Sequence, residues 1–275
     1  MSGWCLRWAV ATLGSLLLLL PSYVGAQGSP GQAIPRGPDG RPDLSGLWQV
    51  MNNAAWNLED QNAAPGPHSA PWLGIPASRG VVDGGEIPYQ PWARTRREEN
   101  YKNRLRLDPE VNCFLPGVPR ITYMPFPFQI VQTPTYIGML YEYVHAVRHV
   151  YVDGSMHPPG PIEWWMGDSR GRWDGDTLVV SVRHFNADTW FDRAGNFHSE
   201  EMQLTERYSF VDRDTIRYEV TVEDPKVFTR PWKMSMLLYR RKEPNFQLLD
   251  HECYAFDGVA VGTRPQDRID GVRPQ

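Results

Sequence analysis

WWMGDSRGRWDGDTLVVSV, from Trp164 to Val182, is the stretch that decides the fold. Asp174 and Gly175 stand between two runs of aromatic and β-branched residues, and an Asp-Gly pair in that setting is a strong signal for a tight β-hairpin. We therefore expect an antiparallel sheet centred on this turn.

Short strand-like segments continue on both sides of the hairpin. The candidates lie at about 127–133, 136–144, 147–152, 161–166, 171–174, 176–185, 201–211, 214–224, 232–241 and 247–255. Their number and their tight turns predict a mainly β domain over residues 113–260, an antiparallel meander closed into a lipocalin-like barrel, with a β-sandwich as the alternative. Little helix is expected in this half of the chain, which excludes a doubly wound α/β fold.

The residues before this domain have a different composition. Residues 27–112 are rich in Pro, Gly, Asn and Ala, which predicts a long irregular arm. Two elements interrupt it. One is a strand near 44–50, in which Gly46-x-Trp48 resembles the start of lipocalin barrels, and the other is one short helix near 92–106. Residues 261–275 are assigned to a C-terminal tail.

Residues 1–26 predict a secretory signal peptide, with an uncleaved N-terminal anchor as the alternative. Arg7 precedes an apolar run that ends at Leu20, and the small residues Gly25 and Ala26 follow. No later stretch approaches the roughly 20 apolar residues that a spanning helix needs. We therefore expect no integral membrane segment after signal removal, and a mature protein that is periplasmic or secreted.

The charge of the chain argues against nucleic-acid binding. Removing the leader takes away one base, Arg7, and no acid, so the formal net charge moves from -4 to -5. No basic run extends beyond the cluster at Arg94, Arg96 and Arg97. The footprint of a DNA- or RNA-binding surface is therefore missing.

Cys113 and Cys253 are the two cysteines that remain after cleavage, and an exported protein allows them to oxidise. We predict that they form a disulfide bond, with two buried free thiols as the alternative. The bond would close a loop of about 140 residues, which stabilises by roughly 4 to 5 kcal/mol in the chain-entropy model.

Several motifs distributed over the mature chain carry a resemblance to a protein family. They read PDLSGLWQ, CFLPGVPR, VYVDGSMHP, GDSRGRWDGDTLVV, NADTWFDRAGNFHSE and TVEDPKVFTRPW. Together they resemble a large group of exported bacterial proteins of unassigned function, abundant in acidobacteria and proteobacteria. Because no catalytic residues are assigned in this group, the resemblance gives no catalytic roles to residues of this chain.

The alternation of apolar residues places one carboxylate inside the barrel. Glu206 shares its face with Leu204 and Tyr208, and a three-residue turn between its strand and the next sets Tyr208 opposite Tyr218. A buried carboxylate needs a partner. We favour a structural ion pair of Glu206 with an inward Arg148, with a catalytic base as the alternative.

Topology gathers a second set of residues at one end of the barrel. The set consists of His184, Asp188, Trp190, Asp192, His198, Glu200, Asp224, Arg230 and Trp232. It combines titratable groups with large aromatics around a possible cavity mouth. The Asp174-Gly175 turn lies at the other end and sets register, so only 167–170 of that stretch could reach the mouth. His157 is interpreted as a turn residue and Asp168 as an Asx-turn residue.

Several chemistries lack their sequence signatures. No HExxH-type spacing is present, and His198-x-Glu200 with His184 is the nearest candidate set, so neither a metal nor a cofactor is expected. The absence of G-x-S-x-G argues against serine hydrolysis, and a Cys113–Cys253 bond would argue against cysteine catalysis. No nucleotide-binding glycine motif is present. Glycoside hydrolysis by two carboxylates stays open.

Two functions remain. The first is an exported enzyme that acts by general acid-base chemistry on a small apolar or aromatic molecule in the barrel, as a lyase, isomerase, cyclase or hydrolase. Its catalytic candidates are His184 and His198 as bases, Asp224 and Glu206 as carboxylates, and Arg148 as an anion stabiliser. Its substrate-binding candidates are Trp190, Trp232, Arg230, Tyr218, Asp188 and Asp168. The second function is a non-catalytic lipocalin-like binding protein.

Overall fold

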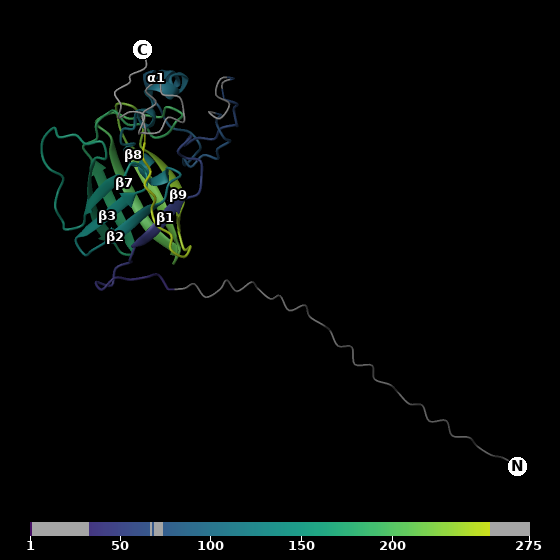
Figure 1. Ribbon diagram of the computed structural model, residues 1–275, viewed down its shortest axis with the longest axis vertical. Helices are drawn as coiled ribbons and strands as arrows, with labels where there is room; N and C mark the ends of the chain where they lie inside the picture. The colour runs from purple at the N-terminus through teal and green to yellow at the C-terminus, as the bar shows by residue number, and fades with distance from the viewer. Residues whose placement is uncertain (2–32, 67, 69–73, 254–275) are drawn as a thin grey trace, which may run out of the picture. The chain divides into compact units, whose positions relative to one another are not determined.

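The computed structural model describes residues 1, 33–66, 68 and 74–253, and its described strands form the expected closed β-barrel (Figure 1). The strands are β1 Gly46–Val50, β2 Phe128–Gln132, β3 Tyr136–Tyr141, β4 Val147–Tyr151, β5 Asp168–Asp174, β6 Thr177–Arg183, β7 Gln203–Asp212, β8 Thr215–Glu223 and β9 Trp232–Arg240. The predicted signal peptide after Met1 and the predicted tail 261–275 lie outside the described residues.

The predicted central hairpin forms, with Gly175 and Asp176 as its two turn residues. Asp174 of β5 pairs with Thr177 of β6, and Gly175 between them has a φ of 58°, which glycine adopts without steric penalty. The antiparallel register continues along both strands to Asp168 opposite Arg183. Outward residues of β5 therefore face outward residues of β6 along the whole hairpin.

One pair of neighbouring strands is parallel, which a simple meander does not allow. β4 and β5 run in the same direction because the residues between them cross back along the outside of the barrel, as the teal-green segment in Figure 1 shows. The strand expected at 161–166 is wrong, since this segment contains only an isolated bridge from Trp164 to Phe185. Pro158, Pro159 and Pro161 lack the N–H groups that a central strand needs.

The strand that closes the barrel comes from the arm. β1 pairs with β2 on one side and with β9 on the other, both antiparallel. The last expected strand, 247–255, is wrong over its described part, where the only β contact is an isolated bridge from His251 to Tyr143. Gly46 enters β1 at a φ of 141°, and its missing Cβ leaves room for the Arg240 guanidinium.

The rest of the arm is irregular, as expected, and carries short helices. In its described part these are α1 Pro91–Lys102, α2 Arg104–Leu107 and the 3-10 helix η2 Pro109–Asn112, and α3 Arg120–Tyr123 follows the arm. The single helix expected at 92–106 is thus two helices that break at Asn103. The arm contacts the end of the barrel where β9 begins, through bridges from Val82 to Met234 and from Tyr89 to Phe228. Figure 1 shows α1 at this end.

Buried charges and a disulfide fasten the arm. Arg120 forms two hydrogen bonds with Asp108, at 2.7 and 2.9 Å, and a third with Glu110 at 2.6 Å. The predicted bond between Cys113 and Cys253 is present, with 5.5 Å between the Cα atoms, and it ties the arm to the chain beyond β9. The ion pairs of Arg120 and the disulfide bond therefore fix the position of this part of the chain.

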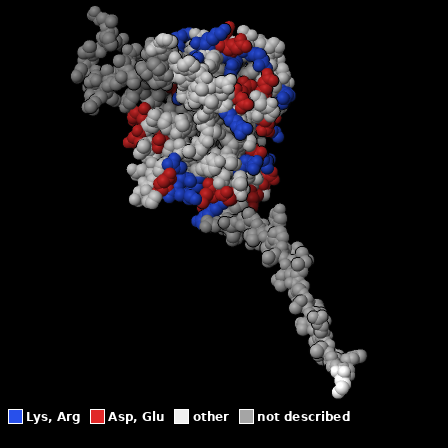
Figure 2. Space-filling model, turned by 90° about the vertical axis from the view of Figure 1, so that its right-hand side faces the viewer, with Lys and Arg blue, Asp and Glu red and all other residues white. Residues whose placement is uncertain are grey.

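The barrel interior is filled with side chains. Trp48, Phe128, Tyr208 and Tyr218 are fully buried together with the inward aliphatic residues of β6, β7 and β8. On the face of the molecule in Figure 2, acidic and basic side chains lie interspersed around an uncharged area. None of the described helices is both long and apolar enough to cross a membrane.

Candidate functional site

The expected ion pair inside the barrel is present. Arg148 of β4 donates to both carboxylate oxygens of Glu206 of β7, and its guanidinium also donates to the Oγ of Ser169 at 3.0 and 3.1 Å. The Glu206 side chain is fully buried. Two charges removed from water in this way must satisfy each other.

Two tyrosines complete the bonding of Glu206. The hydroxyl groups of Tyr208 and Tyr218 donate to its Oε1 at 3.2 and 2.5 Å. Burial raises the pKa of Tyr218 well above its ordinary value, so its hydroxyl stays protonated and keeps donating. Three of the predicted site residues, Arg148, Glu206 and Tyr218, therefore form one closed network in the core.

The predicted cavity mouth is covered by loops and by the arm. His198 is buried there between the rings of Phe185 and Phe191. Its Nδ1 donates to the Ser199 carbonyl at 2.9 Å, so its Nε2 accepts from the Thr189 hydroxyl at 2.6 Å. Burial lowers the pKa of His198. The ring is neutral and both of its nitrogens are occupied.

Asp224 at the same end organises backbone. Its carboxylate accepts from the Ser199 N–H at 2.6 Å and the Ser199 hydroxyl at 2.9 Å, and then from the N–H groups of Lys226 and Val227. It therefore joins the loop before β7 to the turn after β8 and does not contact His184 or His198 by a hydrogen bond.

The other residues expected at the mouth are dispersed. Trp190 and Trp232 are buried, and Trp232 packs edge-on against Phe191 and Phe228. Asp188 and Arg230 are exposed. The predicted mouth is a packed end of the barrel, and no hydrogen bond between described residues joins His184 or His198 to a carboxylate of the predicted set there.

Two of the predicted site residues, Asp168 and His184, instead lie in a polar cluster on the outer wall of the barrel. His157, from the segment that crosses between β4 and β5, connects the residues of this cluster. Its Nδ1 lies 2.6 Å from Oδ2 of Asp168, and its Nε2 lies 3.0 Å from the Oγ of Ser181. The interpretations of Asp168 as an Asx-turn residue and of His157 as a turn residue are wrong: Asp168 begins β5, and His157 packs on the sheet.

The hydrogen-bond roles follow from the chemistry of the groups. An ionised carboxylate only accepts, so His157 donates from Nδ1 to Asp168 and a neutral ring has Nε2 free to accept from the Ser181 hydroxyl. This is the serine–histidine–aspartate arrangement that activates a serine for nucleophilic attack. The motif G-x-S-x-G is absent because Ser181 lies in the middle of a strand rather than on a sharp turn.

Arg170 holds the carboxylate of this cluster. Its Nε and one terminal nitrogen each lie 2.8 Å from Asp168, one on each oxygen. Partial burial raises the pKa of Asp168, but the bonds from Arg170 and His157 outweigh it and hold that pKa below its ordinary value. Partial burial lowers the pKa of His157 despite the neighbouring carboxylate. At neutral pH the ring is an uncharged base.

His184 borders the cluster with a ring that makes no hydrogen bond to any described residue. Its ring centroid lies 6.0 Å from that of His157 and 5.9 Å from that of Trp164. Its backbone has a φ of 64°, an unfavourable conformation for a non-glycine residue that often marks functional sites. The ring is half-buried.

The sequence contained part of the signal for this cluster. The Asp174-Gly175 hairpin fixes the pairing of Asp168 with Arg183 and of Arg170 with Ser181. These side chains therefore share one face, which the sequence alone allows one to work out. Nothing in the sequence places His157 on that face, because a proline-rich connection has no periodicity.

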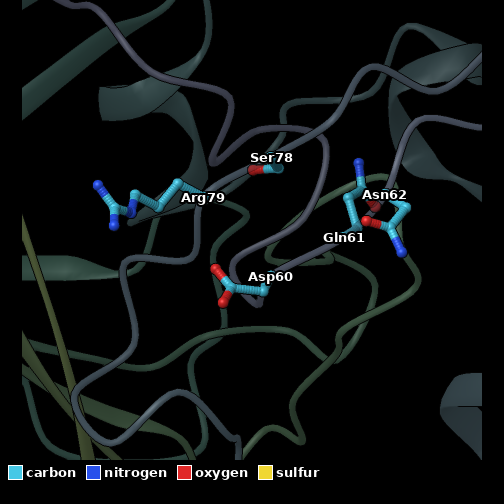
Figure 3. Close-up of a pocket in the computed structure, with 5 residues that line it drawn as sticks. All are labelled: Asp60, Gln61, Asn62, Ser78 and Arg79. Atoms are coloured by element: carbon cyan, nitrogen blue, oxygen red, sulfur yellow. The ribbon is translucent and has the colours of Figure 1, made fainter.

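A separate hollow lies in the arm (Figure 3). Its volume is about 380 Å³, and it is lined by Asp60, Gln61, Asn62, Ser78 and Arg79. Figure 3 shows the Arg79 guanidinium on one side and the Asn62 amide on the other, so their polar groups do not converge. Among the described residues, no group of three or more His, Cys, Asp or Glu side chains is arranged to hold a metal ion.

Comparisons with known proteins add no assignment. No protein-family model matches this chain, and no curated protein and no solved structure matches it.

Proposed function

We propose that this protein is an exported hydrolase of small esters, in which Ser181 is the nucleophile, His157 the general base and Asp168 the group that orients the histidine. The observation that carries the proposal is the position of the His157 ring, which bonds Asp168 through Nδ1 at 2.6 Å and Ser181 through Nε2 at 3.0 Å. This geometry supports the assignment of these roles more directly than a sequence motif does.

The chemistry proceeds in two balanced steps. The Ser181 oxygen attacks the ester carbonyl carbon while His157 takes the hydroxyl proton; the C–O bond to the leaving group then breaks, and the leaving oxygen receives that proton. A water molecule next attacks the acyl carbon while His157 takes one of its protons; the bond between that carbon and the Ser181 oxygen then breaks, His157 gives the proton to this oxygen, and the free acid departs. The imidazole of His184 lies beside His157, where it can donate to the carbonyl oxygen.

The proposed setting is the periplasm or the cell exterior. The disulfide between Cys113 and Cys253 supports an oxidising compartment, and the signal-peptide prediction agrees with it. Binding of a ligand inside the barrel has less support, because Glu206 and the tyrosines around it are buried and bonded to one another.

The test is covalent labelling followed by turnover. The oxidised protein is treated with a fluorophosphonate, which modifies activated serines, and the modified peptide is identified by mass spectrometry. Hydrolysis of 4-nitrophenyl acetate is measured in parallel. We expect labelling at Ser181 and hydrolysis above the buffer rate.

Matched variants separate catalysis from folding. Ser181→Ala removes the nucleophile, whereas Ser209→Ala removes an outward serine of β7 that makes no bond to His157. Asp168→Asn should lower kcat by on the order of a hundredfold or more, since the amide no longer fixes the tautomer of His157. Hydrolysis that is equal in Ser181→Ala and in the unmodified protein would refute the proposed function.

A further inference from the structure

The outward face of the sheet around Ser181 carries several arginines, and not all of them have an acidic partner among the described residues. The register sets Arg170 directly opposite Ser181, Arg183 opposite Asp168 and Arg172 opposite Val179. All three arginines belong to the outward face, since Ser169 between Asp168 and Arg170 points inward to Arg148. Arginines therefore flank Ser181 both on its own strand, β6, and on the neighbouring strand, β5.

Ion pairing accounts for only part of this charge. Arg170 is bonded to Asp168, and Arg207 on the neighbouring strand β7 is bonded to Asp174 at 3.2 Å. Arg172 and Arg183 are exposed and form no ion pair with a described residue. Two uncompensated cations on one patch stand out in a chain whose formal net charge is -4.

Arg183 is the closer of these two cations to the catalytic groups. Its charge contributes to the lowering of the His157 pKa, although burial is the larger cause. Successive outward residues of a strand are about 7 Å apart, which places the Arg183 backbone that far from Ser181. The flexible side chain can cover that distance.

The described acidic residues around this patch do not form an ion pair with Arg183, so its guanidinium can bind an anion. The crossing segment contributes Asp153 and Glu163, and Asp153 is hydrogen-bonded to Ser155, whose hydroxyl also accepts from Arg170. Asp168 already receives bonds from Arg170 and His157. An exposed guanidinium without a partner is a ready site for a carboxylate, sulfate or phosphate group.

We infer that the natural substrate is an anionic ester, whose negative group binds Arg183 while its carbonyl lies at Ser181. This inference rests on the proposed hydrolase function. The spacing favours a compact substrate in which a few bonds separate the anionic group from the ester.

The experiment compares two substrates of nearly the same size, 4-acetoxybenzoate and 4-acetoxybenzamide, of which only the first is charged. With the oxidised full-length protein we expect kcat/KM to favour the benzoate by about tenfold, mainly through KM, as for one hydrogen-bonded charge. Arg183→Gln should reduce this preference to near unity. Arg217→Gln, which removes an exposed arginine of β8, should leave it unchanged.

The outcomes separate the two proposals. If wild type hydrolyses both substrates through Ser181 without favouring the benzoate, or if Arg183→Gln keeps the preference, the anionic-substrate inference is wrong and the hydrolase function stands. If Ser181→Ala hydrolyses both substrates as fast as wild type, the hydrolase function itself is wrong. A preference that declines with added salt in wild type, but not in Arg183→Gln, supports the inference further.

Discussion

The Nε2 of His157 lies 3.0 Å from the Oγ of Ser181, although 24 residues separate the two in sequence. The contact exists because the chain between β4 and β5 crosses outside the barrel and sets its histidine on the outward face of the sheet. Since Asp168 starts β5 on the same face, three side chains from three segments meet in line.

The pH dependence of ester hydrolysis should report the ionisation of His157. The base must be uncharged, so activity is complete above the pKa of this histidine and is lost as the pH falls through it. Partial burial lowers that pKa, so the midpoint should lie below the ordinary value of about 6.5. The measurement is kcat/KM for 4-nitrophenyl acetate as a function of pH. A midpoint clearly above 6.5 would contradict this assignment.

Breaking the interior ion pair should strongly destabilise the barrel. Arg148→Met leaves the Glu206 carboxylate buried without its cation, and the free energy of unfolding should decrease by about 3–5 kcal/mol. Urea unfolding followed by tryptophan fluorescence measures this change. As a control, the double variant Arg148→Met with Glu206→Leu removes both charges and should recover much of the loss; a double variant as unstable as the single one would argue against the explanation by buried charge.

Removal of the disulfide should destabilise the fold without changing the position of Ser181. Cys113 and Cys253 are 140 residues apart in sequence. A loop of this size corresponds to about 5 kcal/mol in the chain-entropy model. The double variant Cys113→Ser with Cys253→Ser should therefore unfold at lower urea concentration, and wild type with a reductant should match it. Equal midpoints with and without reductant would show that the bond adds no stability.

Asp192 should make stability depend on pH in the direction opposite to most carboxylates. Burial raises its pKa from 3.8 to about 6, although bonds from Asn196 and from the Leu58 N–H oppose the shift. A raised pKa means that Asp192 stays protonated to a higher pH in the folded protein than in the unfolded chain. The associated stability is present below about pH 4 and is lost as the pH rises through about 6.

The comparison variant for this effect is Asp192→Asn, which cannot ionise. Between pH 4 and pH 7 wild type should lose on the order of 3 kcal/mol relative to the variant, as a shift of about two pH units implies. Thermal or urea unfolding at several pH values gives the difference. A constant difference over this range would mean that Asp192 titrates normally.

The strands were largely predictable because each one carries its own alternation. The hairpin at Asp174 and Gly175 and the pairing of Tyr208 with Tyr218 appear as predicted, since turn type and inward parity together fix register. The pairing of Glu206 with Arg148 was predictable for the same reason. A buried charge requires a buried partner, and Arg148 is an inward residue of β4.

The cavity mouth that the sequence predicts is absent from the described residues, because other segments of the chain fill it. Strand ends do meet there, but the arm and the loop after β6 fill the space, so His198 and Asp224 bond to backbone and to Thr189 and Ser199. The course of an irregular arm depends on contacts between residues far apart, such as Arg120 with Asp108 and Cys113 with Cys253. No local pattern encodes that course.

By itself the sequence favoured the barrel over a sandwich, the interior ion pair over a catalytic carboxylate and the disulfide over free thiols, because each follows from local periodicity or from a requirement for a partner. Only the tertiary structure decided that β4 and β5 are parallel, that the strand expected near 44–50 pairs with both β2 and β9, and that His157 joins Asp168 to Ser181. These features depend on how the irregular connecting segments pack against the barrel. Their sequences have no repeating apolar pattern, so the packing free energy of the whole barrel decides where they lie.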